Sequence, residues 1–327
     1  MTSTAVFTAR QQASVGQTSR AVSILEQASR HGDVDALFCL ATWHLAGYAV
    51  PRDLPRARTF LRRAVEIGHV DAALMEVALT ANGSGGPMGW AAALELLQTA
   101  ARNDPVAQDQ YALIDLMRLR SDGYPVAKPS GQALTSQWDV RLFRGFLSAG
   151  ECHHIIMQGE DLLEPAMVVD PQTGRSVPNS VRTSDGGIFG PAREDMVIQA
   201  INRRIAAASG TTVSCGEPLT LLRYAIGQQY RAHHDCLPQT SNQRAWTMLV
   251  YLNEGYAGGE TEFPRLGLSI KGRKGDALLF RNVDDHGLPA PAAAHLGASV
   301  TAGQKWLCTR WIRASPHDPW NPIEQAV

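Results

Sequence analysis

Three segments in the first third of the 327-residue chain repeat at a constant offset of 36 residues. They are ILEQASRHGDVDAL (24–37), FLRRAVEIGHVDAA (60–73) and LLQTAARNDPVAQD (96–109). Leucine recurs at 25, 61 and 97, and alanine recurs at 28, 64 and 100. A repeat of this length, rich in Ala and Leu, is typical of paired helices stacked as a solenoid, in which each pair packs only against its neighbours. We therefore predict a helical repeat domain over residues 20–117.

These units resemble Sel1-like repeats, which are relatives of tetratricopeptide repeats. The third unit departs from the pattern, because GSGGPMGW (83–90) replaces the loop and Asn103-Asp104 replaces a turn that ends in glycine. We expect this unit to act as a cap or as a layer that docks onto the rest of the chain. Concave faces of such repeats often bind peptides or partner proteins. A purely stabilising or dimerising role is the open alternative.

The remaining chain predicts a second domain, since 327 residues exceed the usual size of a single core. Residues 1–19 are polar and are expected to be a flexible N-terminus or a short helix. Residues 118–137 contain Gly, Pro and Ser and predict a linker. The second domain is then expected at 138–313, followed by a C-terminal tail at 314–327.

Short apolar runs separated by turn residues predict strands in this second domain. Many short strands with such punctuation favour a sandwich or jelly roll. Apolar residues at helical spacing also predict one helix over 191–210. The expected fold class is therefore α+β and multidomain, with a helical solenoid before a jelly roll. The predicted strands are TMLVYL (247–252), LSI (268–270), DALLF (276–280) and KWLCTRWIR (305–313).

His233, Asp235 and His295, followed ten positions later by Lys305, are the candidate chemical site. Alternate residues of a strand face the same side, so His233 and Asp235 can bind one metal together. Two imidazoles and one carboxylate suit Fe(II) and leave coordination positions open. A structural zinc site would be filled by four protein ligands, typically including cysteines. A His-x-Asp tripeptide alone is weak evidence, because such short motifs have many false positives.

Further segments accompany this triad in a fixed order. They are FLSAGECHHII (146–156), SVRTSDGG (180–187), PAREDMVIQAINRRIAAASG (191–210), EPLTLLRYAIGQQYRAHHD (217–235), WTMLVYLNEGYAGGETEFPRLGLSIKGRKGDALLF (246–280) and HLGASVTAGQKWLCTRWIR (295–313). With them the chain resembles the prolyl 4-hydroxylase-like branch of the iron(II)/2-oxoglutarate dioxygenases over about residues 138–313. The resemblance implies a double-stranded β-helix, a form of jelly roll.

The resemblance also implies roles for individual residues. His233, Asp235 and His295 would bind iron, and the family spacing to Lys305 favours His295 over His286. Lys305 would pair with the distal carboxylate of 2-oxoglutarate, which agrees with the need of a buried charge for a partner. The resemblance implies that Tyr224 and Thr261 bind the same cosubstrate, and their hydroxyls can donate charge-assisted hydrogen bonds to it. Trp311 would lie near the active site, and Arg244 and Arg182 are candidate substrate residues.

The implied cofactors are Fe(II), 2-oxoglutarate and dioxygen, with ascorbate as a further candidate. Asp235 favours hydroxylation, because halogenases of the family carry a small residue there. The expected reaction is hydroxylation of an unactivated C–H bond, on a prolyl or other residue of a peptide or protein, with release of succinate and CO2. Two alternatives stay open: hydroxylation of a free or carrier-bound amino acid, and a non-catalytic repeat scaffold with a degenerate oxygenase fold.

Composition and charge limit which binding partners and which cellular compartment we expect. The net charge of −1 gives no basic excess for nucleic acid. No apolar run is long enough to predict a membrane span, and no secretory signal is evident. The five cysteines are odd in number and scattered, which is typical of free thiols in a reducing compartment. We therefore expect a cytoplasmic protein without nucleic-acid or membrane partners. The family resemblance implies a peptide or protein substrate, and the helical repeats are expected to help bind it.

Overall fold

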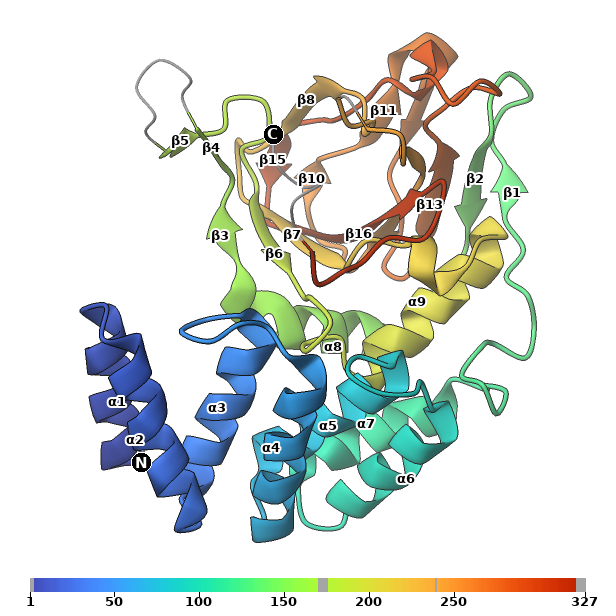
Figure 1. The fold of residues 1–327 in the computed structure, drawn as a ribbon. Helices are drawn as coiled ribbons and strands as arrows, with labels where there is room; N and C mark the ends of the chain where they lie inside the picture. The colour runs from blue at the N-terminus through green and yellow to red at the C-terminus, as the bar shows by residue number, and fades with distance from the viewer. Residues whose placement is uncertain (1–2, 170–175, 239, 322–327) are drawn as a thin grey trace. The chain divides into compact units, whose positions relative to one another are not determined.

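A computed structural model describes residues 3–169, 176–238 and 240–321 of the chain. The chain forms two compact units. The first comprises Met1–Gly123 with Pro191–Gln199, and the second comprises Tyr124–Gly190 with Ala200–Val327. Figure 1 shows helices in the N-terminal part of the chain and strands in most of the remainder. None of the helices in the described part of the chain has the length and apolar character that crossing a membrane requires.

The first unit consists of antiparallel helices joined by short turns, as the repeats predict. Each 36-residue unit forms one helix pair: α2 with α3, α4 with α5, and α6 with α7. The recurring leucines Leu25, Leu61 and Leu97 are all fully buried, so they form the core between successive helices. Residues 4–14 form the short helix that was one of two expectations for the N-terminus. The helices are α1 Thr4–Ser14, α2 Thr18–Arg30, α3 Val34–Ala46, α4 Leu54–Ile67, α5 Val70–Asn82, α6 Trp90–Ala100 and α7 Pro105–Leu116.

Side-chain caps fix where these helices begin. Asp33, Asp53 and Asp104 each accept a hydrogen bond from the backbone N–H three residues later. Such caps satisfy backbone donors that a helix leaves unpaired at its first turn. Asp104 explains why the irregular third turn still starts a helix without the glycine of the other units.

A buried ion pair joins α4 to α5. Arg58 donates from Nε and Nη2 to the two carboxylate oxygens of Glu76 at 2.8 and 2.7 Å. Both residues are at most 5% exposed. The pair therefore places a charge in the helical core that is stable only while both partners are present.

The second unit contains two main sheets whose strand pairings are all antiparallel. The larger has the order β1-β2-β13-β9-β16-β7-β6-β3, and the smaller has the order β12-β11-β14-β8. The larger-sheet strands are β1 Gln132–Ala133, β2 Val140–Phe143, β3 Glu164–Pro165, β6 Asp185–Ile188, β7 Thr220–Tyr224, β9 Arg244–Tyr251, β13 Ala277–Arg281 and β16 Lys305–Arg313. The smaller-sheet strands are β8 Tyr230–His233, β11 Thr261–Phe263, β12 Leu268–Ile270 and β14 His295–Gly297. Two separate ribbons are β4 Met167–Val169 with β5 Ser176–Pro178, and β10 Ala257–Gly258 with β15 Val300–Ala302.

Side chains from both main sheets pack into one core. Leu222, Tyr251 and Leu278 from the larger sheet share this core with Phe263 and Ile270 from the smaller one. Two antiparallel sheets that enclose a common apolar layer form a sandwich. The structure therefore confirms a helical repeat region followed by a double-stranded β-helix domain.

Two helices accompany the sheets. Helix α8, Ala149–Gly159, starts with a capping box in which Ser148 and Glu151 satisfy each other's backbone N–H groups. Helix α9, Met196–Ser209, lies inside the predicted range of 191–210. Arg204 of α9 donates to both carboxylate oxygens of Glu151 at 2.6 and 3.0 Å, which links the two helices. The described part of the chain also contains four short 3-10 helices: η1 Glu160–Leu162, η2 Val213–Cys215, η3 Pro264–Leu266 and η4 Pro291–Ala293.

Candidate metal and cosubstrate site

The smaller sheet brings the three predicted metal ligands together. Strands β8 and β14 pair with His233 opposite His295, and Asp235 follows two residues after His233. One possible ligand atom from each of the three residues lies within 4.8 Å of the others. His233 Nε2 lies 3.5 Å from Asp235 Oδ1, and His295 Nε2 lies 3.8 Å from Asp235 Oδ2. His286, the competing candidate, lies in an exposed turn and is not part of this cluster.

Both imidazoles are held in the tautomer that a metal requires. His233 Nδ1 lies 2.8 Å from the carbonyl oxygen of Arg231, and His295 Nδ1 lies 3.0 Å from that of Ala293. A carbonyl only accepts, so each Nδ1 carries the proton and each Nε2 keeps its lone pair. His233 Nε2 is buried and has no hydrogen-bond partner among the residues that the structure describes. Two free imidazole nitrogens and one carboxylate therefore fit a divalent iron ion.

The charge states also suit metal binding. Burial alone would raise the pKa of Asp235, but His295, His233 and the hydrogen bond from Thr247 bring it well below the ordinary value. Burial lowers the pKa of His295 to about 4, against the opposing effect of Asp235. At neutral pH the site thus presents an ionised carboxylate and a neutral imidazole, the forms that bind metals.

Lys305 fits the carboxylate of a cosubstrate. It is 2% exposed, and its Nζ donates to the carbonyl oxygen of Gly259 at 2.6 Å. Within the described ranges no carboxylate forms an ion pair with it. Burial lowers the pKa of Lys305 to about 7, because desolvation disfavours the ammonium. A buried cation whose partner is only a carbonyl matches a ligand that brings its own negative charge.

The other predicted cosubstrate residues surround this lysine. Tyr224 lies opposite Lys305 in the pairing of β7 with β16, and Lys305 Nζ lies 5.4 Å from the centre of its ring. Thr261 is 2% exposed, and its hydroxyl oxygen lies 3.0 Å from the hydroxyl of Tyr251. Lys305, Tyr224 and Thr261 all line the same pocket as the metal triad.

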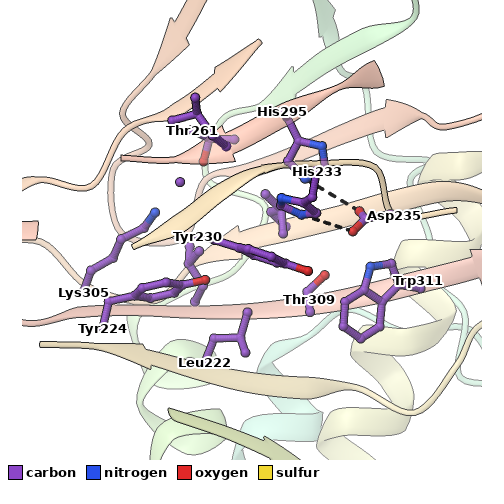
Figure 2. A pocket seen from close by; sticks show the side chains of 14 residues that line it. Leu222, Tyr224, Tyr230, His233, Asp235, Thr261, His295, Lys305, Thr309 and Trp311 are labelled. Atoms are coloured by element: carbon purple, nitrogen blue, oxygen red, sulfur yellow. Dashed lines mark ion pairs between the residues drawn. The ribbon is translucent and has the colours of Figure 1, made fainter. Parts of the chain in front are cut away.

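This pocket has a volume of about 410 Å³, part of it open to solvent. Figure 2 shows Lys305 and Tyr224 at one end and Trp311 at the other, with Tyr230 and His233 between them. The fourteen lining residues are Leu222, Tyr224, Tyr230, His233, Asp235, Leu249, Thr261, His295, Leu296, Gly297, Lys305, Leu307, Thr309 and Trp311. The metal triad and the lysine thus share one mostly apolar cavity.

Seven of the fourteen lining residues were missed by the sequence reasoning, among them Tyr230 and Thr309. The ring of Tyr230 stacks on that of His233, with centroids 3.4 Å apart and planes 13° apart. Thr309 is 1% exposed, and its hydroxyl has no hydrogen-bond partner within the described ranges. The signal for Thr309 was strand alternation, because positions 305, 307, 309 and 311 of β16 all face the pocket.

The two candidate substrate arginines lie at the edge of this site and not among its lining residues. Arg244 donates to both carboxylate oxygens of Glu217 at 2.7 Å, and its guanidinium carbon lies 4.0 Å from the centre of a Trp311 ring. Arg182 lies 6.0 Å from the centre of the Tyr230 ring, and its buried Nε has no partner within the described ranges. A substrate role for either arginine stays a prediction.

Comparison with known proteins gives the family. A family model described as the 2OG-Fe(II) oxygenase superfamily matches residues 219–313. Prolyl 4-hydroxylase 1 of Arabidopsis thaliana is 37% identical over 197 residues, which cover 54% of this chain and 70% of that protein. The chain belongs to the prolyl 4-hydroxylase-like 2OG-Fe(II) oxygenases. Probable prolyl 4-hydroxylase 3 of the same plant is 32% identical over 65% of this chain and 85% of its own length.

Solved structures resemble parts of this 2-oxoglutarate oxygenase. A viral collagen prolyl hydroxylase from Paramecium Bursaria Chlorella virus-1 is 28% identical, with a TM-score of 0.45 over 56% of this chain and 99% of that one. A Sel1 repeat protein from Oxalobacter formigenes is 21% identical, with a TM-score of 0.29 over 31% of this chain and 42% of that one.

Proposed function

We propose that this oxygenase hydroxylates a prolyl or other residue of a peptide or protein and converts 2-oxoglutarate to succinate and CO2. One observation carries the reaction type. A complete His233, Asp235 and His295 triad shares its pocket with a buried Lys305 that has no carboxylate partner within the described ranges. The names of the related plant proteins, prolyl 4-hydroxylases, support a prolyl substrate.

The residues of the chain bind and orient the reactants. The triad would hold Fe(II), and Lys305, Tyr224 and Thr261 would hold 2-oxoglutarate beside it. When bound, iron and this cosubstrate together activate dioxygen for attack on a C–H bond. Tyr230 and Trp311 form walls of the pocket. Burial raises the pKa of Tyr230 to about 12, so its phenol stays neutral during turnover.

The substrate is expected to enter near Trp311, at the end of the pocket opposite Lys305. A side chain bound there would face the metal triad while Lys305 holds the cosubstrate at the far end. A role of the helical repeats in binding a polypeptide, and of Arg244 and Arg182 in contacting it, stays a prediction.

The test is succinate formation by purified protein loaded with Fe(II) and 2-oxoglutarate under anaerobic conditions and then exposed to oxygen. We expect proline-containing peptides to increase succinate and to gain the mass of one oxygen atom on proline. His233→Ala should abolish both signals, whereas His286→Ala, in its exposed turn, should retain them. Succinate formed with free amino acids but with no peptide would refute the polypeptide substrate. Absence of succinate with every substrate would favour the scaffold alternative.

A further inference from the structure

A chain of buried hydrogen bonds ends on the metal-binding carboxylate. The hydroxyl of Thr247 donates to Asp235 Oδ2 at 2.6 Å. The side-chain amide of Asn282 donates from Nδ2 to the oxygen of that hydroxyl at 2.8 Å. Asp235, Thr247 and Asn282 are 6%, 0% and 1% exposed, so water does not compete for these bonds.

The direction of this chain follows from the groups themselves. An ionised carboxylate only accepts hydrogen bonds, and a threonine hydroxyl has one hydrogen to donate. The Thr247 hydrogen therefore points to Asp235, and its oxygen needs a donor from elsewhere. Asn282 supplies that donor through its NH2 group, whose orientation is thereby fixed.

The donors are anchored in the larger sheet. Thr247 lies within β9, where it pairs with Phe280 of β13 and Trp311 of β16. Asn282 directly follows β13, and its backbone N–H donates to the carbonyl oxygen of Ala245 at 2.8 Å. The backbone of Asn282 also accepts from the N–H of Ala290 at 2.9 Å. Asp235 follows a strand of the smaller sheet, so the chain of hydrogen bonds links the two sheets at the metal site.

We propose that Thr247 and Asn282 are positioning residues of the metal site: they hold the carboxylate of Asp235 by Oδ2 and leave Oδ1 to bind the metal. Binding through one oxygen matters because an iron oxygenase needs open positions for its cosubstrate and dioxygen. A freely rotating carboxylate could bind through both oxygens and occupy one of those positions. The hydrogen bond from Thr247 therefore contributes to metal affinity and keeps a coordination position of the metal open.

The test measures binding of Co(II) alone, by anaerobic calorimetry on the full chain without cosubstrate. Thr247→Val has nearly the same shape but no hydroxyl, and we expect it to raise the Co(II) Kd about 10- to 100-fold, as loss of such outer partners usually does. Thr247→Ser keeps the hydroxyl and should restore a Kd close to that of the wild type. The matched control is Thr220→Val, a buried threonine of β7 outside the pocket, whose hydroxyl lies 3.5 Å from the carbonyl oxygen of Pro218. It should leave the Kd unchanged.

Variants of Asn282 provide a second, independent test by the same Co(II) binding measurement. Asn282→Leu should raise the Co(II) Kd less than Thr247→Val does, because it acts through the threonine. The double variant should bind Co(II) no more weakly than Thr247→Val alone, since residues that act in series are not additive. Asn282→Asp replaces the donor by an acceptor that competes for the Thr247 hydrogen, so it should weaken binding more than Asn282→Leu does.

The outcomes separate the alternatives. A Thr247→Val protein that folds, by its thermal unfolding curve, and binds Co(II) like the wild type would overturn the proposal, as would additive effects in the double variant. Should Thr247→Val not fold, unchanged binding by Asn282→Leu would overturn it equally. A wild-type protein that binds no Co(II) would overturn the metal site itself, and this inference with it.

Discussion

Burial and charge oppose each other at Lys305. Its ammonium is removed from water, and among the described residues the carbonyl oxygen of Gly259 is its only hydrogen-bond acceptor. Desolvation of this kind is unfavourable, and a carboxylate bound beside the lysine would offset it. The residue is thus better matched to a protein that binds a carboxylate than to the free protein, which supports the proposal that Lys305 holds the cosubstrate.

The lowered pKa of Lys305 predicts a pH dependence of cosubstrate use. Below pH about 7 the lysine of the free enzyme is charged, and above that value it is neutral. The value of kcat/KM reports groups of the free enzyme, so kcat/KM for 2-oxoglutarate should fall as pH rises through about 7. Lys305→Arg keeps its charge throughout this range and should remove the fall, whatever its absolute activity. An identical pH profile for both proteins would contradict this role of Lys305.

Some residues of the site could be predicted from the sequence and others could not. His233, Asp235, His295 and Lys305 were found because their types and spacing form a motif. Thr309 was accessible in principle from the alternation along β16. Thr247 and Asn282 were not, because their relation to Asp235 depends on which strands pair and on where two sheets meet. Side chains that act through another residue leave no local signal.

Some secondary-structure elements could likewise be predicted from the sequence, and others could not. The predicted strand 305–313 coincides with β16, and 247–252 covers the last five residues of β9 and one residue beyond it. Both are long, apolar and bounded by turn residues, so they can be predicted from the sequence. Strand β8 has only four residues, none of them fully buried, and it pairs with β14 more than 60 residues later. Its strand character comes from that distant partner and not from local propensity.

The ion pair between α4 and α5 leads to a prediction at the scale of the helical repeats. Glu76→Ala leaves the buried guanidinium of Arg58 without its carboxylate and should lower the free energy of unfolding by about 3–5 kcal/mol. Urea denaturation followed by circular dichroism measures this change. Glu95→Ala, at an exposed position of α6, is the control and should change it by less than about 0.5 kcal/mol. Equal effects of the two substitutions would show that the pair contributes nothing.

At the scale of the whole molecule, the chemistry is confined to one of the two units. Every residue that lines the pocket belongs to the second unit. All but Asp235, which follows β8, lie on strands β7, β8, β9, β11, β14 and β16. The order of a helical repeat region before a β-rich domain could be predicted from the sequence, because the 36-residue repeat gives way to short strands separated by turn residues. We therefore expect ligand binding to stabilise the β-sandwich and not the helical repeats.

Hydrogen exchange measured by mass spectrometry can locate that effect in the intact chain. A ligand that binds only the folded state stabilises it by about 2.7 kcal/mol at a concentration of one hundred times its Kd. With Co(II) at such a concentration, we expect slower exchange in residues 230–235 and 295–297. Adding 2-oxoglutarate should extend the protection to 305–311. The amides of α2 to α5 should exchange at unchanged rates.

Two variants assign that protection to the site. His233→Ala should lose the protection caused by Co(II). Lys305→Ala should lose only the additional protection at 305–311, because in our proposal the lysine binds the cosubstrate and not the metal. Protection that persists in His233→Ala, or that appears equally in α2 to α5, would mean that the metal binds elsewhere. The site would then not be the place where ligand binding and stability are coupled, and the assignment of His233 as a metal ligand would have to be abandoned.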